Sequence, residues 1–194
     1  GPVDPRHGAR VAAHPGPRHP LLPPARAVAQ RAPTPAYRGA DAALVDDDGV
    51  PDLLGTRLRV IAADGSVLEH GAPPAQWDAL VAEAAPGDPA PRPYLIRLGP
   101  DGGAYRVGPI AQLRVGAVTG ARASAMQERW LEVGGGLAAR AVLAVHSVEA
   151  VAELLRRPAL VGGPVGEPVP VPEGPDVGVG WVDGPRGLLV HRYC

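Results

Sequence analysis

The sequence contains no lysine, asparagine or phenylalanine, and its single cysteine, Cys194, is the last residue. One thiol cannot form a disulfide framework or a cysteine-held metal cluster within one copy of the chain. The N-terminus shows no charged start followed by an apolar stretch of signal-peptide length, and no run approaches the roughly 20 apolar residues of a membrane span. These absences predict a cytoplasmic protein in a reducing compartment.

The charge balance shows no excess of either sign. All 19 basic residues are arginine, they face 20 acidic residues, and the formal net charge is -1. Because both signs are spread along the whole sequence, the chain has no basic stripe for a phosphate backbone, and we expect no nucleic-acid binding. A chain of 194 residues has room for one ordinary domain, whose core must be built from valine, leucine and alanine.

Proline and glycine divide the chain. Closely spaced prolines in residues 1–36 predict an arm that is extended or disordered, followed by a folded domain over residues 37–194. Within that domain, Asp64-Gly65 separates two apolar runs, 58–61 and 67–69, which predicts a β-hairpin. Residues 74–84 predict a short helix, with Trp77, Leu80 and Val81 on one face.

The second half of the chain carries the longest helical patterns. Residues 121–133 and 137–157 predict two helices, separated by three glycines at 134–136 that would cost about 3 kcal/mol inside a helix. In the later helix we expect one face to line the core: Val142, Val145, Val148, Ala152 and Leu155. Residues 177–182 and 188–191 predict a pair of strands, and the chain ends in what reads as mid-strand, which favours a fragment.

This order of elements predicts an α+β fold, in which the antiparallel hairpin region packs on the helix-GlyGlyGly-helix unit and a C-terminal strand pair follows. His146 and His191 lie 45 residues apart with no third ligand in view, so we expect them to pack or to form hydrogen bonds rather than to bind a metal.

Three segments, taken together and in this order, resemble a known family. Residues 105–113 are similar to the pattern Tyr-x-Val-Gly-Pro-x-Ala-Arg-Leu, with Gln112 where arginine is usual. The helix, triple glycine and helix follow, with Glu149 on the later helix. Residues 178–193 are similar to Gly-x-Gly-x-x-Glu-Ala-Pro-Arg-Gly-x-Leu-x-His-x-Tyr. The family that carries these patterns is the large, catalytic subunit of NiFe hydrogenases, most closely the cytoplasmic NAD(P)-linked and multimeric class.

The resemblance implies a partial large-subunit fold and a set of partners. In the intact family two Cys-x-x-Cys pairs hold a NiFe(CO)(CN)2 centre, and neither pair occurs in this chain. The implied partners are a small iron–sulfur subunit and, as a further option, diaphorase subunits. We therefore expect a partial or degenerate large subunit that is inactive alone. The alternatives are a metal-free paralogue that binds subunits or assists assembly, and an unrelated α+β protein.

The resemblance also implies two site residues. Pro185 and Arg186 match the Pro-Arg that overhangs the metal centre in the intact family, where a fixed guanidinium helps to polarise H2. Gly184 and Gly187, on either side, would allow close approach of the backbone. The competing interpretation is that an arginine at the tip of a hairpin is a solvated turn residue.

Overall fold

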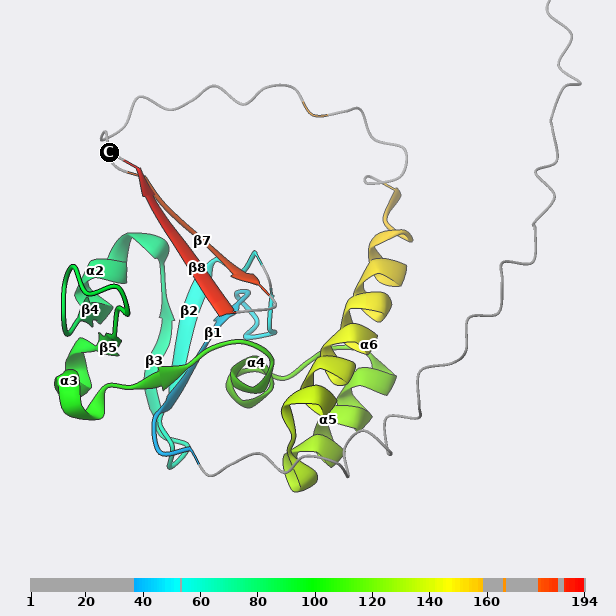
Figure 1. Cartoon of the computed structure of the whole chain (residues 1–194). Coiled ribbons are helices and arrows are strands. Elements are labelled where there is room, and N and C mark those ends of the chain that lie inside the picture. Colours follow the sequence, from blue (N-terminus) through cyan, green and yellow to red (C-terminus); the bar gives the residue numbers. More distant parts are fainter. Residues whose placement is uncertain (1–36, 53, 159–165, 167–177, 185–186, 194) are drawn as a thin grey trace, which may run out of the picture.

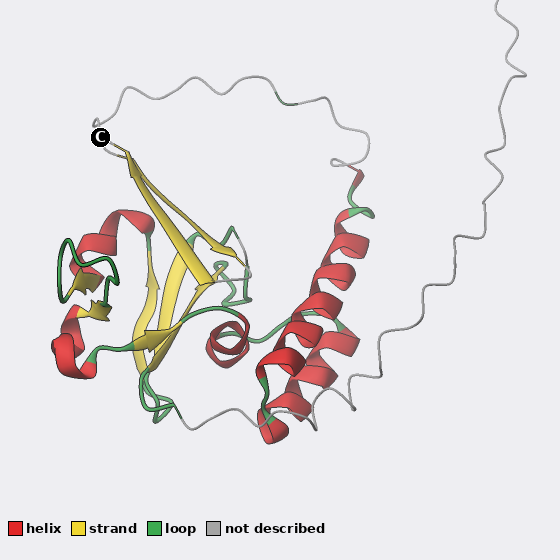
Figure 2. Ribbon diagram, in the orientation of Figure 1, coloured by secondary structure: helices red, strands yellow, loops and turns green. Residues whose placement is uncertain are grey.

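A computed structural model describes residues 37–52, 54–158, 166, 178–184 and 187–193 (Figure 1). The predicted N-terminal arm, residues 1–36, lies outside the described residues. The described part combines sheets with helices, which agrees with the predicted mixed α+β class (Figure 2). Among these residues, no helix is both long enough and apolar enough to cross a membrane.

The main sheet has four strands in the order β3-β2-β1-β6: β1 (Ala40–Val45), β2 (Arg57–Ile61), β3 (Val67–Ala72) and β6 (Tyr105–Arg106). Strand β1 runs antiparallel to β2 and parallel to β6, and β2 and β3 are antiparallel. The predicted hairpin is confirmed, and Gly65 in its turn has a φ of 89°, a conformation that glycine adopts without steric cost.

Strand β1 is buried on both faces, which is unusual for a strand in a small antiparallel hairpin region. On one face Ala42 and Leu44 pack with Leu58 and other apolar residues of the sheet. On the other face the core contains Ala43 and Val45 of β1 together with Val115 of α4 (Pro109–Val115). Because alternate side chains of a strand point to opposite faces, an uninterrupted run of small apolar residues suits this position.

Helix α4 lies between the sheet and a pair of longer helices, α5 (Ala121–Val133) and α6 (Gly136–Leu154) (Figure 1). The predicted packing of the hairpin region on the helix pair is thus mediated by a helix that sequence analysis did not identify. The predicted glycine break is confirmed at Gly134 and Gly135, which have φ values of 74° and 102°, while Gly136 already begins α6. Trp130 closes this loop by donating a hydrogen bond from Nε1 to the carbonyl oxygen of Gly135, 2.9 Å away.

The expectation that one face of α6 lines the core is correct only for its first half. Val142 is buried, but Val148 and Leu155 are 69% and 68% exposed, and Ala152 is exposed as well. The reason is length: α6 has 19 residues and α5 has 13. At a rise of about 1.5 Å per residue, α6 continues roughly 9 Å beyond the helix that covers it.

The single helix predicted over residues 74–84 is wrong. The segment forms a 3-10 turn, η1 (Pro74–Gln76), one short helix, α2 (Trp77–Leu80), and then a strand, β4 (Val81–Glu83). Val81 adopts an extended conformation because it pairs with Leu95 of β5 (Pro93–Leu95). The predicted apolar face is nevertheless real, since Trp77, Leu80 and Val81 all pack on the core of the main sheet.

The predicted C-terminal strand pair is confirmed as an antiparallel ribbon of β7 (Gly178–Gly184) and β8 (Gly187–Tyr193). Trp181 fastens β7 to the rest of the protein by donating a hydrogen bond from Nε1 to the carbonyl oxygen of Gly55, 2.9 Å away. Trp181 and Leu188 both pack against the core of the main sheet. The remaining short elements, η2 (Ile96–Leu98) and α3 (Gly99–Gly102), connect β5 to β6.

A buried carboxylate joins the sheet to α4. Asp41 of β1 is 1% exposed, and its two oxygens accept hydrogen bonds from Arg106 Nε at 2.7 Å and from Arg114 Nε at 2.6 Å. Arg106 belongs to β6 and Arg114 to α4, so one side chain ties three elements together. The guanidinium of Arg106 also lies over the ring of Tyr37, 4.7 Å from its centroid.

We predict that Asp41→Asn lowers the free energy of unfolding by about 2–4 kcal/mol, because both guanidiniums lose the charge that compensates their burial. The matched control is Asp47→Asn, which removes the carboxylate of an exposed ion pair with Arg57 and should cost less than about 1 kcal/mol. Urea unfolding followed by circular dichroism measures both. Equal effects of the two substitutions would contradict a structural role for the buried carboxylate.

Candidate functional site

The segments that resemble the hydrogenase patterns meet in space. Gly187, at the start of β8, has a φ of 128°, and a Cβ atom placed on it would lie 2.5 Å from Cγ2 of Val107. No larger residue fits at this contact without a shift of the chain. Leu188 packs in the same apolar cluster as Tyr105 and Val107. The end of the β7–β8 ribbon therefore rests on the segment that connects β6 to α4.

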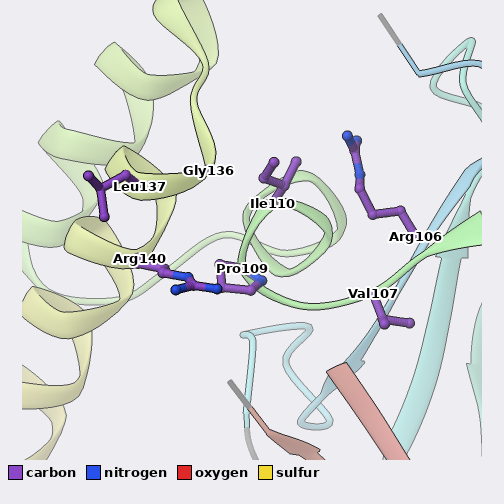
Figure 3. Close-up of a pocket in the computed structure, with 7 residues that line it drawn as sticks. All are labelled: Arg106, Val107, Pro109, Ile110, Gly136, Leu137 and Arg140. Atoms are coloured by element: carbon purple, nitrogen blue, oxygen red, sulfur yellow. The ribbon is translucent and has the colours of Figure 1, made fainter. Parts of the chain in front are cut away.

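A pocket of about 300 Å³ opens beside this contact, where the beginnings of α4 and α6 face each other (Figure 3). It is lined by two arginines and by apolar or small residues: Arg106, Val107, Pro109, Ile110, Gly136, Leu137 and Arg140. The first four belong to the first resembling segment and the last three to the second. All three resembling segments thus contribute to one region of the surface.

The two arginines of the pocket are held differently. Arg106 is fixed by Asp41, and its side chain is 20% exposed. Arg140 is exposed and has no ion-pair partner among the residues that the structure describes. The pocket therefore presents one compensated and one uncompensated positive charge against apolar walls.

The candidate catalytic residues Pro185 and Arg186 lie outside the described residues. Their neighbours Gly184 and Gly187 are described, and they form the last pair of the β7–β8 ladder. The turn that carries Arg186 therefore leaves and re-enters the fold at the contact with Val107. The direction of the Arg186 side chain stays a prediction.

Sequence reasoning missed Asp183, which directly precedes Gly184. Asp183 is 0% exposed, and neither of its carboxyl oxygens has a hydrogen-bond partner of good geometry. Burial raises the pKa of this carboxyl group, and the neighbouring side chain of Gln112 and main-chain amide of Leu44, which both lower the pKa, do not reverse the rise. A buried acid of this kind favours its neutral form.

The position of Asp183 follows from the shape of the sheet. Strand β6 pairs with β1 only at Ala40 and Asp41, so the edge of β1 beyond them has no strand beside it. A buried main-chain amide on such an edge needs another acceptor. The amide of Leu44 lies on this stretch, and Asp183 and Gln112 lie next to it. The ribbon thus places a polar side chain where the main sheet lacks a strand.

One signal for Asp183 was present in the sequence. Asp183 stands where the family pattern has glutamate, and Gln112 stands where it has arginine. The structure shows that these two departures from the pattern are neighbours. A shorter acid therefore accompanies the replacement of a cation by a neutral amide, which fits a pair that carries no net charge.

Glu149, the other polar residue of the resembling segments, has a structural role. Its carboxylate accepts hydrogen bonds from the main-chain amides of Arg122 at 3.2 Å and Ala123 at 3.1 Å. These amides belong to the first turn of α5, whose positive end is stabilised by an acidic group. Glu149 therefore caps α5 from α6.

The side chains of this chain do not fit a NiFe centre by themselves. Such a centre is held by thiolates, and the whole sequence has one cysteine. Within the described ranges, no group of three or more histidine, cysteine, aspartate or glutamate side chains is placed to hold a metal ion. His146 Nδ1 lies 3.1 Å from the carbonyl oxygen of Thr119, and the ring of His191 stacks on Tyr193, so both histidines make local contacts.

We predict that Asp183→Asn changes how stability depends on pH. Because the pKa of Asp183 is raised above 3.8 in the folded protein, its contribution is complete below pH 3.8 and is lost as the pH rises through the folded-state value. The wild type should therefore lose stability relative to Asp183→Asn as the pH increases, and the variant should be the more stable protein at pH 7.

Asp64→Asn is the control with the opposite sign. Hydrogen bonds from Ser66 lower the pKa of Asp64, so its contribution is present above pH 3.8 and is lost as the pH falls. Thermal unfolding between pH 3 and pH 8 measures all three proteins. A constant difference between the wild type and Asp183→Asn over this range would show that Asp183 titrates normally.

Comparison with known proteins gives the same family as the resembling segments, although no family model matches the chain. The chain is 30% identical to the vhu subunit of the F420-non-reducing hydrogenase of Methanococcus voltae over 155 residues, which cover 75% of this chain and 36% of that protein. It also matches the crystal structure of NAD+-reducing [NiFe]-hydrogenase in the H2-reduced state, with a TM-score of 0.71 and 33% identity, over 81% of this chain and 37% of that chain. The chain spans a little over a third of the length of these relatives. Over that part, it is related in sequence and in fold to the large subunit of NiFe hydrogenases.

Proposed function

We propose that this chain is part of the catalytic large subunit of a NiFe hydrogenase and forms the protein wall that carries Arg186 over the metal centre. The observation that supports this best is the meeting of the three resembling segments, at the contact of Gly187 with Val107 and at the adjoining pocket. A chance likeness of composition would not bring separate segments together in this way.

The role of Arg186 in this proposal is electrostatic. Its guanidinium stays charged at any working pH, and its donors form a rigid fork that a fixed turn can aim. Pro185 restricts the backbone of that turn, and the close fit of Gly187 on Val107 fixes where the turn begins. A preorganised cation of this kind stabilises charge that develops during a reaction.

The same proposal accounts for the missing cysteines. The thiolates that hold nickel and iron come from parts of the subunit outside these residues, so the chain alone is inactive. The partners are a small iron–sulfur subunit and, in an NAD(P)-linked assembly, diaphorase subunits, all in the cytoplasm. The solved relative is an NAD+-reducing enzyme, which supports this class of assembly.

A metal-free paralogue that binds subunits is the second candidate. It is favoured by large apolar side chains on the surface of α6, where Val148 is 69% exposed and Leu155 is 68% exposed. Exposed apolar residues grouped on one element are typical of interaction surfaces. A paralogue of this kind would retain its partners without any need for Arg186.

A chimera tests the two candidates. We predict that residues 37–194, placed in the large subunit of the NAD+-reducing relative in exchange for the segment they match, support H2-dependent reduction of NAD+. Arg186→Ala should then lower kcat by about 10²-fold or more, as the loss of a preorganised charge does elsewhere, with nickel and iron content unchanged. The control is Arg129→Ala, which removes an exposed arginine of α5 and should leave kcat unchanged.

Metal analysis separates the outcomes. A chimera that holds stoichiometric nickel and iron but is equally active with and without Arg186 would refute the proposed role. A chimera that assembles with its partners, holds both metals and is inactive would favour the paralogue. Nickel or iron bound stoichiometrically by the isolated 194-residue chain would overturn the account of the thiolates.

A further inference from the structure

Helix α6 carries a second apolar stripe that nothing in the described structure covers. We call this stripe the α6 seam. Its six residues follow one another at intervals of four and three, the spacing of the a and d positions of a heptad repeat: Leu137, Ala141, Ala144, Val148, Val151 and Leu155. The four large ones are 61%, 69%, 53% and 68% exposed in chain order.

The α6 seam is distinct from the face by which α6 joins the core. That other face contributes the buried residues Ala138, Ala139 and Val142, which pack with α4 and α5. In an α-helix each residue turns by about 100°, so the seam lies well away from the centre of this buried face. A helix with apolar residues on both of these sides has the composition of a buried helix.

We propose that the α6 seam is the docking face for another α-helix, supplied by the rest of the same large subunit. The inference rests on the proposed function. The chain matches 37% of the length of the solved relative while 81% of the chain itself is matched, so most of that subunit lies outside the part that this structure describes. A seam of about two and a half heptads is long enough for packing of knobs into holes between helices.

The seam specifies the chemistry of its partner. After Leu137 the seam residues are the small Ala141 and Ala144, so the two helices approach most closely there and the partner supplies large side chains. Toward Leu155 the seam residues are larger, and the partner needs smaller ones. The seam thus favours an apolar helix whose bulk decreases from Ala141 toward the end of α6.

One charge adds direction to this fit. The positions that flank the seam are almost free of charge, and the exception is Arg140, which has no ion-pair partner in the described parts of the chain. The partner helix therefore carries a carboxylate opposite Arg140. Because Leu137 and Arg140 also line the 300 Å³ pocket, this helix covers the mouth of the pocket beside the Val107–Gly187 contact (Figure 3).

Two double variants test the seam with matched changes. Val148→Glu/Leu155→Glu places two charges on the seam, and Ser147→Glu/Leu154→Glu places the same charges at the same spacing on an exposed side of the same helix. In the chimera, the seam variant should lower the yield of assembled, metal-loaded large subunit at least tenfold, and the control should stay within twofold. Equal yields would overturn the proposal.

A photo-crosslinking amino acid at position 151 identifies the occupant in the chimera, or in the complex purified from the native cell where the chimera does not assemble. The proposal requires a crosslinked peptide from another helix of the same subunit, and a crosslinker at position 147 should not give it. A peptide from the small subunit or from a second copy of this chain would overturn it. Seam-dependent assembly of an inactive, metal-loaded chimera would support the seam while refuting the proposed function.

Discussion

The carboxylate of Asp41 is the interaction on which the arrangement of the site depends. It lies in the most buried strand of the sheet and neutralises two arginines, one from the short strand β6 and one from α4. Strand β6 has two residues, too few to hold its place by ladder hydrogen bonds alone. The ion pair with Arg106 keeps this strand on β1, and the chain between β6 and α4 is the surface on which the ribbon rests.

The small side chains of β1 make that arrangement possible. A core without phenylalanine fills its space with valine, leucine and alanine, and β1 is alanine-rich on both faces. Alanine at Ala43 allows α4 to approach the sheet, where Val115 meets Val45. The close approach also brings Gln112 toward the edge of β1 and toward Asp183. Composition that reflects no function of its own thereby determines how near the helix layer lies to the sheet.

The features that were predictable from the sequence have local causes. Asp64-Gly65 makes its hairpin because glycine accepts the positive φ of the turn, and the glycines after α5 stop a helix wherever they occur. The ribbon of β7 and β8 follows from two apolar runs around a glycine-bounded turn. The resembling segments also predicted correctly which family the chain is related to.

The features that were missed have non-local causes. Val81 has a helical neighbourhood in the sequence, yet it extends because Leu95 offers a strand partner. Helix α4 has seven residues and carries no periodic pattern long enough to recognise, and its position is set by Asp41, which lies 73 residues before Arg114. The exposure of Val148 and Leu155 depends on the length of α5, a property of another segment.

The two halves of the fold are complete to different degrees. The main sheet has both faces covered, since one lies against α4 and the other lies under the ribbon and the segment from η1 to β5. The helical layer has one face on α4 and an apolar seam that is open to solvent. Exposed apolar surface lowers the stability gained on folding, and it is tolerated where another element covers it in the assembled protein. The described part of the chain therefore has the structure expected of a portion of a larger subunit, finished on its sheet side and unfinished along α6.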